Sequence, residues 1–170
     1  MSPTETPSAP ATEGSPTSYA SRPGILHYLS LGPEALTRIV DCVKPERYDD
    51  QLEPGRFSLR EAIAHLADFE VTIADRIGIA HEAPGSAVEN FDEDARAQEK
   101  AYATRDVHHE LEVWGNRRRE TIMLLETLSP DDMNKTYIHP QRGEMSIRDF
   151  IGIILGHDVY HLEHASQYLR

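Results

Sequence analysis

Three histidines near the C-terminal end of the chain are spaced so that they fall on one side of a helix. His157 and His161 are four residues apart, and His164 follows three residues later. Neighbouring helical turns bring such residues side by side, so the imidazoles of His157 and His161 can share one divalent metal ion. Two histidines do not usually complete a metal site, and we therefore expect a further ligand from another helix.

The segment that carries these histidines is predicted to be an amphipathic helix, capped by Ser146 and continuing to Arg170. The three histidines and Asp158 project from its apolar face, which is formed by Ile147, Phe150, Ile151, Ile154, Leu155, Leu162, Ala165, Tyr168 and Leu169. Polar groups directed into a core cost free energy unless they are hydrogen-bonded or bind a metal. A lone histidine would be interpreted as a hydrogen-bonded or solvated residue at the helix border, whereas three on one face favour a metal site.

His65 is the best candidate for the ligand from another helix. It lies in the middle of a predicted helix that starts with a capping box of Ser58 and Glu61. Its position is on the shoulder of that helix's apolar stripe. The other histidines are expected at helix ends, on polar flanks or in a connection, and of these only His139 could line the rim of a site: His27, His81, His108, His109 and His139.

The run from His157 to His161 differs from the metalloprotease pattern His-Glu-x-x-His by one methylene, because Asp158 stands in the place of glutamate. The protease pattern needs a further ligand, usually downstream, and only nine residues follow His161. His164 could bind metal, but it shares the same helix and would leave no cleft opposite. The context therefore disfavours a peptidase.

Asp158 and Arg118 are the candidate catalytic residues. Arg118 lies within the apolar stripe of the third predicted helix, which contains Val107, Leu111, Trp114, Ile122 and Leu125. It either pairs with Asp158 or Asp68, or binds a substrate carboxylate. Asp158 could orient an imidazole or act as a base, and the structural alternative is an ion pair with a buried arginine. Asp68 and Glu70 lie near His65 in the sequence and could contact the metal ligands, but the default expectation for both is an exposed carboxylate on the helix face. Cys42 is expected to be a small core residue.

Four predicted helices position these residues. They cover about residues 25–44, 58–82, 105–128 and 146–170, with a possible earlier start of the third between Asp92 and Tyr102. Gly32-Pro33 is expected to kink or restart the first helix. Residues 131–145 are expected to form a connection. Residues 1–22 consist mostly of Ser, Thr, Pro, Ala, Glu and Gly, which predicts a disordered tail ahead of one all-α domain, a four-helix bundle over 23–170.

The composition excludes several classes of function. The chain of 170 residues has 17 Lys and Arg against 29 Asp and Glu, a net charge of −12, which disfavours binding to nucleic acid and to anionic membrane surfaces. No run approaches 18 apolar residues, and the N-terminus lacks the pattern of a signal peptide. The single cysteine excludes an internal disulfide. We therefore expect a cytoplasmic protein.

Three motifs in order along the chain resemble the DinB/YfiT-like superfamily of metal-dependent proteins. They are the run from Phe57 to Asp68, the pair Trp114 and Arg118, and the run His157-Asp158-x-x-His161. The resemblance covers about residues 23–170. It implies a four-helix bundle connected up-down-down-up, a divalent metal, often zinc or nickel, held by His65, His157 and His161, and a homodimer. Characterised members include thiol transferases that use bacillithiol and a mycothiol-dependent maleylpyruvate isomerase.

The sequence departs from the family pattern at two positions. His164 stands where relatives commonly carry glutamine, so it is a candidate fourth ligand or a neighbour of the ligands, and Phe57 stands where relatives often carry tryptophan. The leading hypothesis is a metal-dependent enzyme of the thiol-transferase or hydrolase type that acts on a small molecule, in the first case with a low-molecular-weight thiol. The alternatives are a non-catalytic metal-binding or stress-response module with a structural site, and a bundle that keeps its histidines without metal.

Overall fold

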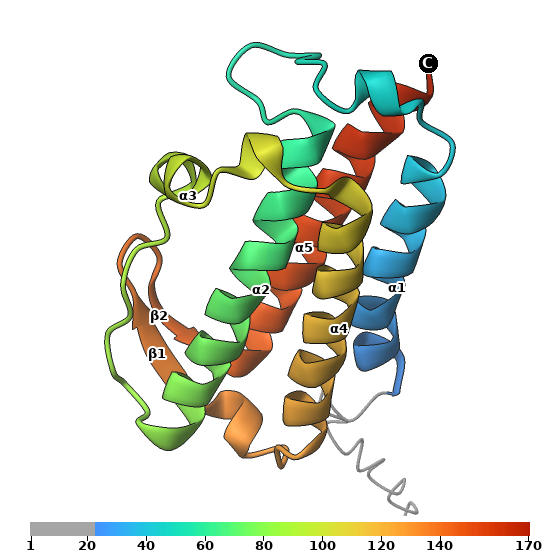
Figure 1. Ribbon diagram of the computed structural model, residues 1–170. Helices are drawn as coiled ribbons and strands as arrows, with labels where there is room; N and C mark the ends of the chain where they lie inside the picture. The colour runs from blue at the N-terminus through green and yellow to red at the C-terminus, as the bar shows by residue number, and fades with distance from the viewer. Residues whose placement is uncertain (1–22) are drawn as a thin grey trace, which may run out of the picture.

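The computed structural model describes residues 23–170 (Figure 1). Its long helices are α1 (Pro23–Val40), α2 (Leu59–Glu82), α4 (Val107–Glu126) and α5 (Ile147–Ser166), and α3 (Glu93–Glu99) is short. Strands β1 (Thr136–His139) and β2 (Gly143–Ser146) form an antiparallel hairpin. The tail predicted over residues 1–22 lies outside the described residues and stays a prediction.

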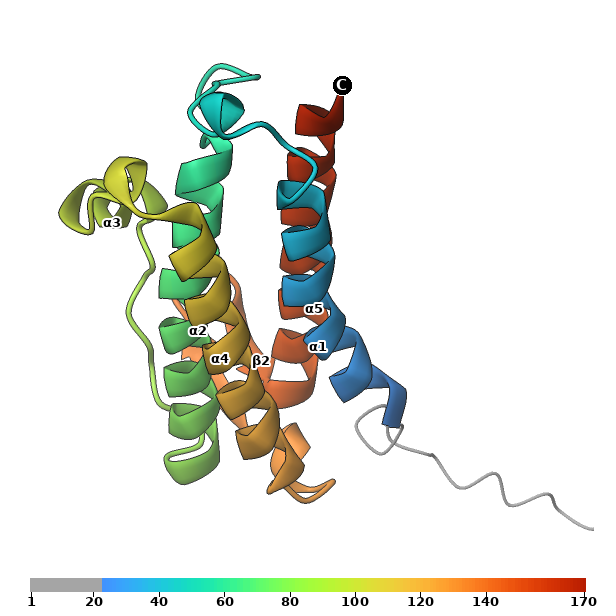
Figure 2. The same cartoon turned by 45° about the vertical axis from the view of Figure 1, so that its right-hand side comes forward.

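The four long helices run up, down, down and up in chain order (Figure 1). α2 and α4 are parallel because the segment between them, residues 83–106, returns along the outside of α2 to the end where α2 began. In the view of Figure 2 the helices form two pairs, α2 with α4 and α1 with α5, and α1 also packs against α4. The predicted all-α bundle with up-down-down-up connections is confirmed.

Local capping explains where the two helices that carry histidines begin. The Ser58 side chain accepts a hydrogen bond from the Glu61 backbone N–H, and the Glu61 carboxylate accepts one from the Ser58 backbone. Ser146 and Asp149 make the same reciprocal contacts at the start of α5. Each box satisfies backbone N–H groups that have no partner inside the helix, so both predicted starts are confirmed.

Two boundaries differ from the sequence prediction. α1 is one helix across Gly32-Pro33, with no restart, and its N-terminal part leans away from the axis of the rest (Figure 2). It ends at Val40, and Cys42 beyond it is exposed, so the prediction of a core cysteine is wrong. The third helix is divided because Ala101 has a left-handed backbone (φ 50°) and Asp106 caps a new start at Val107.

The connection over residues 131–145 contains the β1–β2 hairpin, which the sequence did not reveal. Gly143 takes a positive φ of 75° where β2 begins, a conformation that glycine adopts without strain. The segment after α2 attaches to β1, since Ile138 donates to the Ser86 carbonyl and Val88 donates to the Ile138 carbonyl. These bonds hold residues 83–92 over one side of α2 and the hairpin.

The apolar core is divided into two clusters. One contains Leu36, Val40, Leu59, Ile63, Trp114 and Ala165, and the other contains Leu29, Ile73, Ile77, Leu125, Phe150 and Ile154. Buried polar residues occupy the level between them on three helices: His65 and Glu70 on α2, Arg118 on α4, and Asp158 and His161 on α5. The candidate site residues therefore lie in one polar layer across the middle of the bundle.

Candidate metal centre

Three imidazoles from two helices converge in this polar layer. His65 Nε2, from α2, lies 3.0 Å from His157 Nε2, and His161 Nε2 lies 3.2 Å from the same atom. One ligand nitrogen from each of the three residues lies within 4.8 Å of the other two. The structure thus brings together the three histidines that helical spacing, helix position and family resemblance selected.

The arrangement fits a divalent ion. Imidazole nitrogens bind zinc at about 2.0–2.1 Å, so ligand nitrogens at tetrahedral angles around one ion lie about 3.3–3.4 Å apart. The observed Nε2 separations of 3.0 and 3.2 Å are slightly shorter than that spacing, so a small outward movement of the rings would admit the ion. The Nδ1 atoms of all three histidines are buried without a hydrogen-bond partner among residues 23–170. Within these residues the rings therefore have no polar contact except one another, and a cation between the Nε2 atoms would give those three nitrogens a shared partner, with the proton of each ring on Nδ1.

Burial keeps the three imidazoles neutral. It lowers the pKa of His65 to about 3, with a further contribution from His157. Burial and then the positive charge of Arg118 lower the pKa of His157 to about 4. Burial, followed by the neighbouring histidines, holds the pKa of His161 well below its usual value. Each ring therefore carries an unprotonated nitrogen at neutral pH, as metal binding requires.

Aromatic side chains fix the orientation of His65. Its ring stacks on Phe69 with centroids 5.7 Å apart and an interplanar angle of 10°. Phe57, Phe91 and Tyr102 surround the same imidazole at centroid distances of 5.6, 5.8 and 6.4 Å. These rings limit the rotation of the side chain and exclude water from one side of the centre.

Arg118 and Asp158 pair with each other directly beside the histidines. Arg118 Nη1 lies 2.5 Å from Asp158 Oδ2, and Arg118 Nε donates to Glu70 at 2.9 Å. Burial alone would lower the pKa of Arg118, but the hydrogen bonds and charge of Asp158, together with Glu70, raise it. Burial raises the pKa of Asp158, and Arg118 opposes that shift. Of the alternatives left open by the sequence, the structure shows the ion pair with Asp158.

Glu70 and Asp68 also form polar contacts, and the position of Glu70 differs from the sequence prediction. Glu70 is 1% exposed and accepts a hydrogen bond from Trp114 Nε1 in addition to Arg118, so its prediction as an exposed carboxylate is wrong. Asp68 accepts two hydrogen bonds from Arg96, each 2.9 Å long, and one from the Tyr102 hydroxyl. Asp68 thereby holds α3 and the turn after it against α2.

His164 is buried but lies outside the convergent group. Its ring meets Tyr168 edge-on at a centroid distance of 5.7 Å, and its Nε2 has no hydrogen-bond partner among the described residues. Together with His161, it lines a small cavity closed by Arg56 and Phe57. His164 is placed as a neighbour of the ligands, and its role as a fourth ligand stays a prediction.

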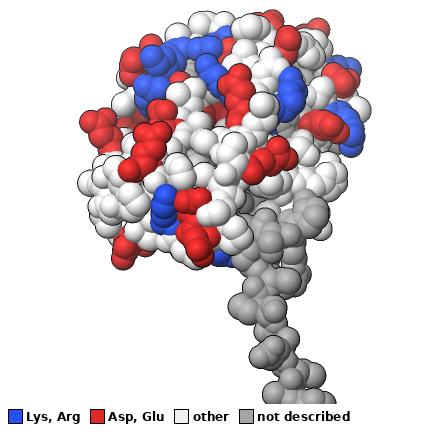
Figure 3. Space-filling view, turned by 90° about the horizontal axis from the view of Figure 1, so that it is seen from below, with Lys and Arg blue, Asp and Glu red and all other residues white. Residues whose placement is uncertain are grey.

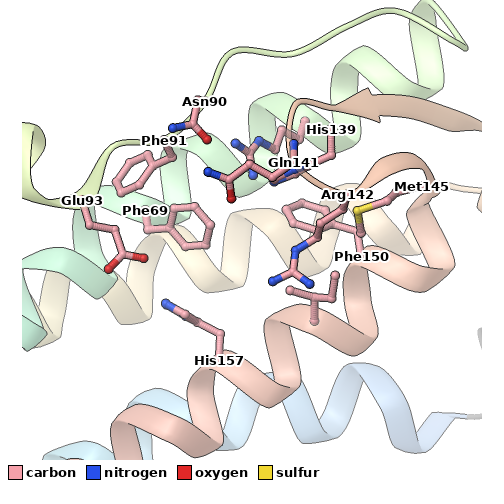
Figure 4. A pocket seen from close by; sticks show the side chains of 12 residues that line it. Phe69, Asn90, Phe91, Glu93, His139, Gln141, Arg142, Met145, Phe150 and His157 are labelled. Atoms are coloured by element: carbon pink, nitrogen blue, oxygen red, sulfur yellow. The ribbon is translucent and has the colours of Figure 1, made fainter.

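A second cavity, of about 150 Å³, opens beside His157 (Figure 4). Its walls come from α2, the segment after α2, the β1–β2 hairpin and α5. His139 lines it, as the sequence allowed. In Figure 4 the Glu93 carboxylate and the His157 imidazole point toward one another across the cavity. Substrate-sized space therefore adjoins the histidine cluster on one side.

Glu93 is a functional candidate that the sequence analysis missed. It is the first residue of α3 and lines both cavities, the one beside His157 and the one beside His161. Burial of its carboxyl, and then the charges of Asp94 and Asp92, raise its pKa. Its sequence context, a run of acidic residues, gave no signal, because only the folded return of residues 83–106 brings it to the histidines.

Comparison with known proteins identifies the family of the chain. Residues 28–165 match the family model of the DinB superfamily, and the chain belongs to that superfamily. It is 30% identical to the protein named "Putative metal-dependent hydrolase OB0782" from Oceanobacillus iheyensis, over 79% of this chain and 77% of the relative. It is 23% identical to "Putative metal-dependent hydrolase YfiT" from Bacillus subtilis, over 81% of this chain and 78% of the relative.

The structural comparison concerns the fold. The chain superposes on the solved structure of YfiT with a TM-score of 0.82 at 20% identity, covering 99% of this chain and 91% of that one. YfiT is described there as "a probable metal-dependent hydrolase with an unusual four-helix bundle topology". The same topology is present here.

Proposed function

We propose that this chain is a metal-dependent hydrolase of a small molecule, with a divalent ion held by His65, His157 and His161. The observation that carries the proposal is the convergence of three neutral imidazole nitrogens, 3.0 and 3.2 Å apart, beside an open cavity. The names of the relatives support the hydrolytic class. Imidazole ligands suit zinc and nickel, the two metals expected from the family.

The residues around the three histidines are assigned different roles in this proposal. A divalent ion bound there would act as a Lewis acid that polarises a substrate oxygen and lowers the pKa of water. Glu93 faces the same cavity and is placed to accept a proton from the attacking water at its carboxylate oxygen. Arg118 and Asp158, the predicted catalytic pair, are assigned a positioning role, because their charges are neutralised within a buried network.

Metal content is the first test. Protein purified without a histidine tag should contain close to one zinc or nickel ion per chain by elemental analysis, and His161→Ala should lose it. His109→Ala, an exposed histidine on α4, is the matched control and should keep it. A wild-type protein without metal, or an H161A variant with full metal content, would contradict the proposal.

The role of Glu93 is tested by hydrolysis of a panel of small esters such as p-nitrophenyl acetate. Loss of a general base typically lowers the rate by about 100-fold to 10,000-fold, so Glu93→Gln should reduce kcat with its metal content unchanged. Glu99→Gln on the same short helix is the control, since Glu99 pairs with Lys100 at the surface. Equal kcat values for E93Q and wild type would remove Glu93 from the mechanism, and metal-loaded protein inactive on every ester would favour the structural-site alternative.

The finer expectations from the family resemblance remain proposals. Thiol transfer is checked by thermal shift with bacillithiol and mycothiol, because a ligand that binds the folded state raises the melting temperature. Homodimer formation is checked by light scattering after size-exclusion chromatography. A thiol that stabilises the metal-loaded protein and not H161A would replace hydrolysis with thiol transfer as the leading reaction.

A further inference from the structure

The cavity beside His157 contains a buried arginine without a carboxylate partner. Arg76, from α2, is 4% exposed. Its Nη2 donates to the Glu89 carbonyl at 3.1 Å, and its Nε has no hydrogen-bond partner in the part of the chain that the structure describes. Among residues 23–170 no carboxylate oxygen lies within 4.0 Å of its guanidinium. Arg76 is therefore a desolvated positive charge that the described part of the chain does not neutralise.

Such a charge is unfavourable on its own. Burial lowers the pKa of Arg76, and the Phe69 and Phe150 rings each lie 5.9 Å from its guanidinium. Arg118, which is buried to a similar extent, has two carboxylates. A guanidinium in aromatic surroundings attracts an anion more strongly than one in water, because the local dielectric constant is low. The contrast indicates that Arg76 has its partner outside residues 23–170, and an anion in the cavity would supply one.

Arg142 adds a second positive charge to the same cavity. It lies on the turn between β1 and β2, and Figure 4 shows its side chain reaching from the hairpin into the cavity. His139 lines the same cavity as both arginines, and burial followed by the charges of Arg76 and Arg142 lowers its pKa. Glu93 is the carboxylate in the lining, and it forms no ion pair with either arginine. In a chain with a net charge of −12, this cavity is a local concentration of positive charge.

We propose that the cavity binds an anionic group of the substrate, a carboxylate or a phosphate, through Arg76 and Arg142. Phe69 contacts both ends of this cavity, because its ring lies 5.1 Å from the His157 ring and 5.9 Å from the Arg76 guanidinium. The inference rests on the proposed function for the position of the reacting bond, one aromatic ring away at the metal centre. The substrate class is therefore a small ester or amide that carries a carboxylate or phosphate, which suits a cavity of about 150 Å³.

The test is calorimetric titration of the purified protein with inorganic phosphate and, in a separate arm, with succinate. Arg76→Met should weaken binding of the preferred anion at least tenfold without loss of metal, and Arg142→Met should weaken it by a smaller factor. Arg148→Met is the matched control, because Arg148 is an α5 arginine that bonds Asn134 at the surface, away from the cavity. It should bind the anion as wild type does. The arm with the tighter binding identifies the anionic group.

A metal-free variant separates this inference from the proposed function. His161→Ala should keep anion binding within about threefold of wild type, because Arg76 and Arg142 hold the anion. Loss of anion binding in H161A, or wild-type affinity in R76M and R142M, would overturn the inference. Absence of metal from the wild-type protein would instead overturn the proposed function. If R76M does not fold, as judged by its melting curve, the exposed Arg142→Met variant decides the result.

Discussion

Arg118 joins two buried carboxylates from different helices, Glu70 on α2 and Asp158 on α5. Arg118→Met keeps much of the side-chain volume but leaves both carboxylates buried without a cation. Breaking a buried ion pair by removing one partner costs about 3–5 kcal/mol, and we expect a loss of that size in urea unfolding. Arg119→Met is the control, because Arg119 is exposed and hydrogen-bonds Asn116 at the surface, and it should change stability by less than about 0.5 kcal/mol. Equal stability of the two variants would contradict the role of the network.

The sequence predicted some of these residues for physical reasons and missed others. The spacing of His157 and His161 is set by one helix, so local geometry was sufficient. His65 required helix position and family resemblance. Glu70 and Arg76 were missed although a signal existed: Leu66, Glu70, Ile73 and Ile77 follow helical spacing, as do Phe69, Ile73, Arg76 and Ala80. A charged residue in phase with an apolar stripe indicates a buried partner or a bound ligand.

The close approach of α1 to α5 depends on Gly32. A Cβ atom there would lie 2.9 Å from Asp158 Oδ2 and 3.4 Å from the Trp114 ring. The carboxylate cannot move away without weakening its bonds to Arg118, so Gly32→Ala should destabilise the protein by about 1–3 kcal/mol. The matched change is Gly78→Ala in α2, where a Cβ would meet nothing within 4 Å and alanine should stabilise the helix by about 0.5–1 kcal/mol. Thermal unfolding checks both predictions: the melting temperature should fall in Gly32→Ala and rise in Gly78→Ala.

The long helices could be predicted from the sequence because each shows an amphipathic period and two begin with capping boxes. The β1–β2 hairpin could not, since its strands have four residues each and its attachment depends on backbone bonds to residues 86–88. Consequently the sequence did not place Arg142 over the site, and it allowed His139 only as a residue that could line the rim. Glu93 was missed for the same reason, because its position follows from the path of a connection.

The three histidines should make the stability of the metal-free protein depend on pH. The unfolded chain protonates histidine near pH 6.5, whereas the folded protein holds the pKa of His65 at about 3 and that of His157 at about 4. The unfolded state therefore binds more protons between pH 6.5 and 4, and the free energy of unfolding should fall as the pH decreases through that range. Urea unfolding at a series of pH values, in excess chelator, measures this decrease in the free energy of unfolding.

A variant isolates the contribution of one ring. His65→Leu removes one of the depressed groups, so its free energy of unfolding should fall less steeply between pH 6.5 and 4 than that of the wild type. Parallel curves for the two proteins would show that His65 is not buried as a neutral imidazole.

The surface of the molecule is acidic overall but not uniform. On the face seen from below in Figure 3, acidic and basic side chains are interspersed with uncharged ones. No helix within residues 23–170 is long and apolar enough to cross a membrane. The excess negative charge of the whole chain makes the positive cavity beside His157 the exception to the general field, and anions that reach it should bind more weakly as the salt concentration rises.

The placement of His65 and His157 has a consequence for folding. The two residues are 92 positions apart and belong to different helix pairs, α2 with α4 and α1 with α5. An ion shared by both would act as a removable cross-link that closes a long loop of chain. For a disulfide of that span, loop closure alone is estimated to stabilise the native state by about 4–5 kcal/mol. Loss of the ion would weaken the packing of α2 against α5 while each helix stayed intact. Amide hydrogen exchange should therefore become faster first in the turns of α2 and α5 that face each other.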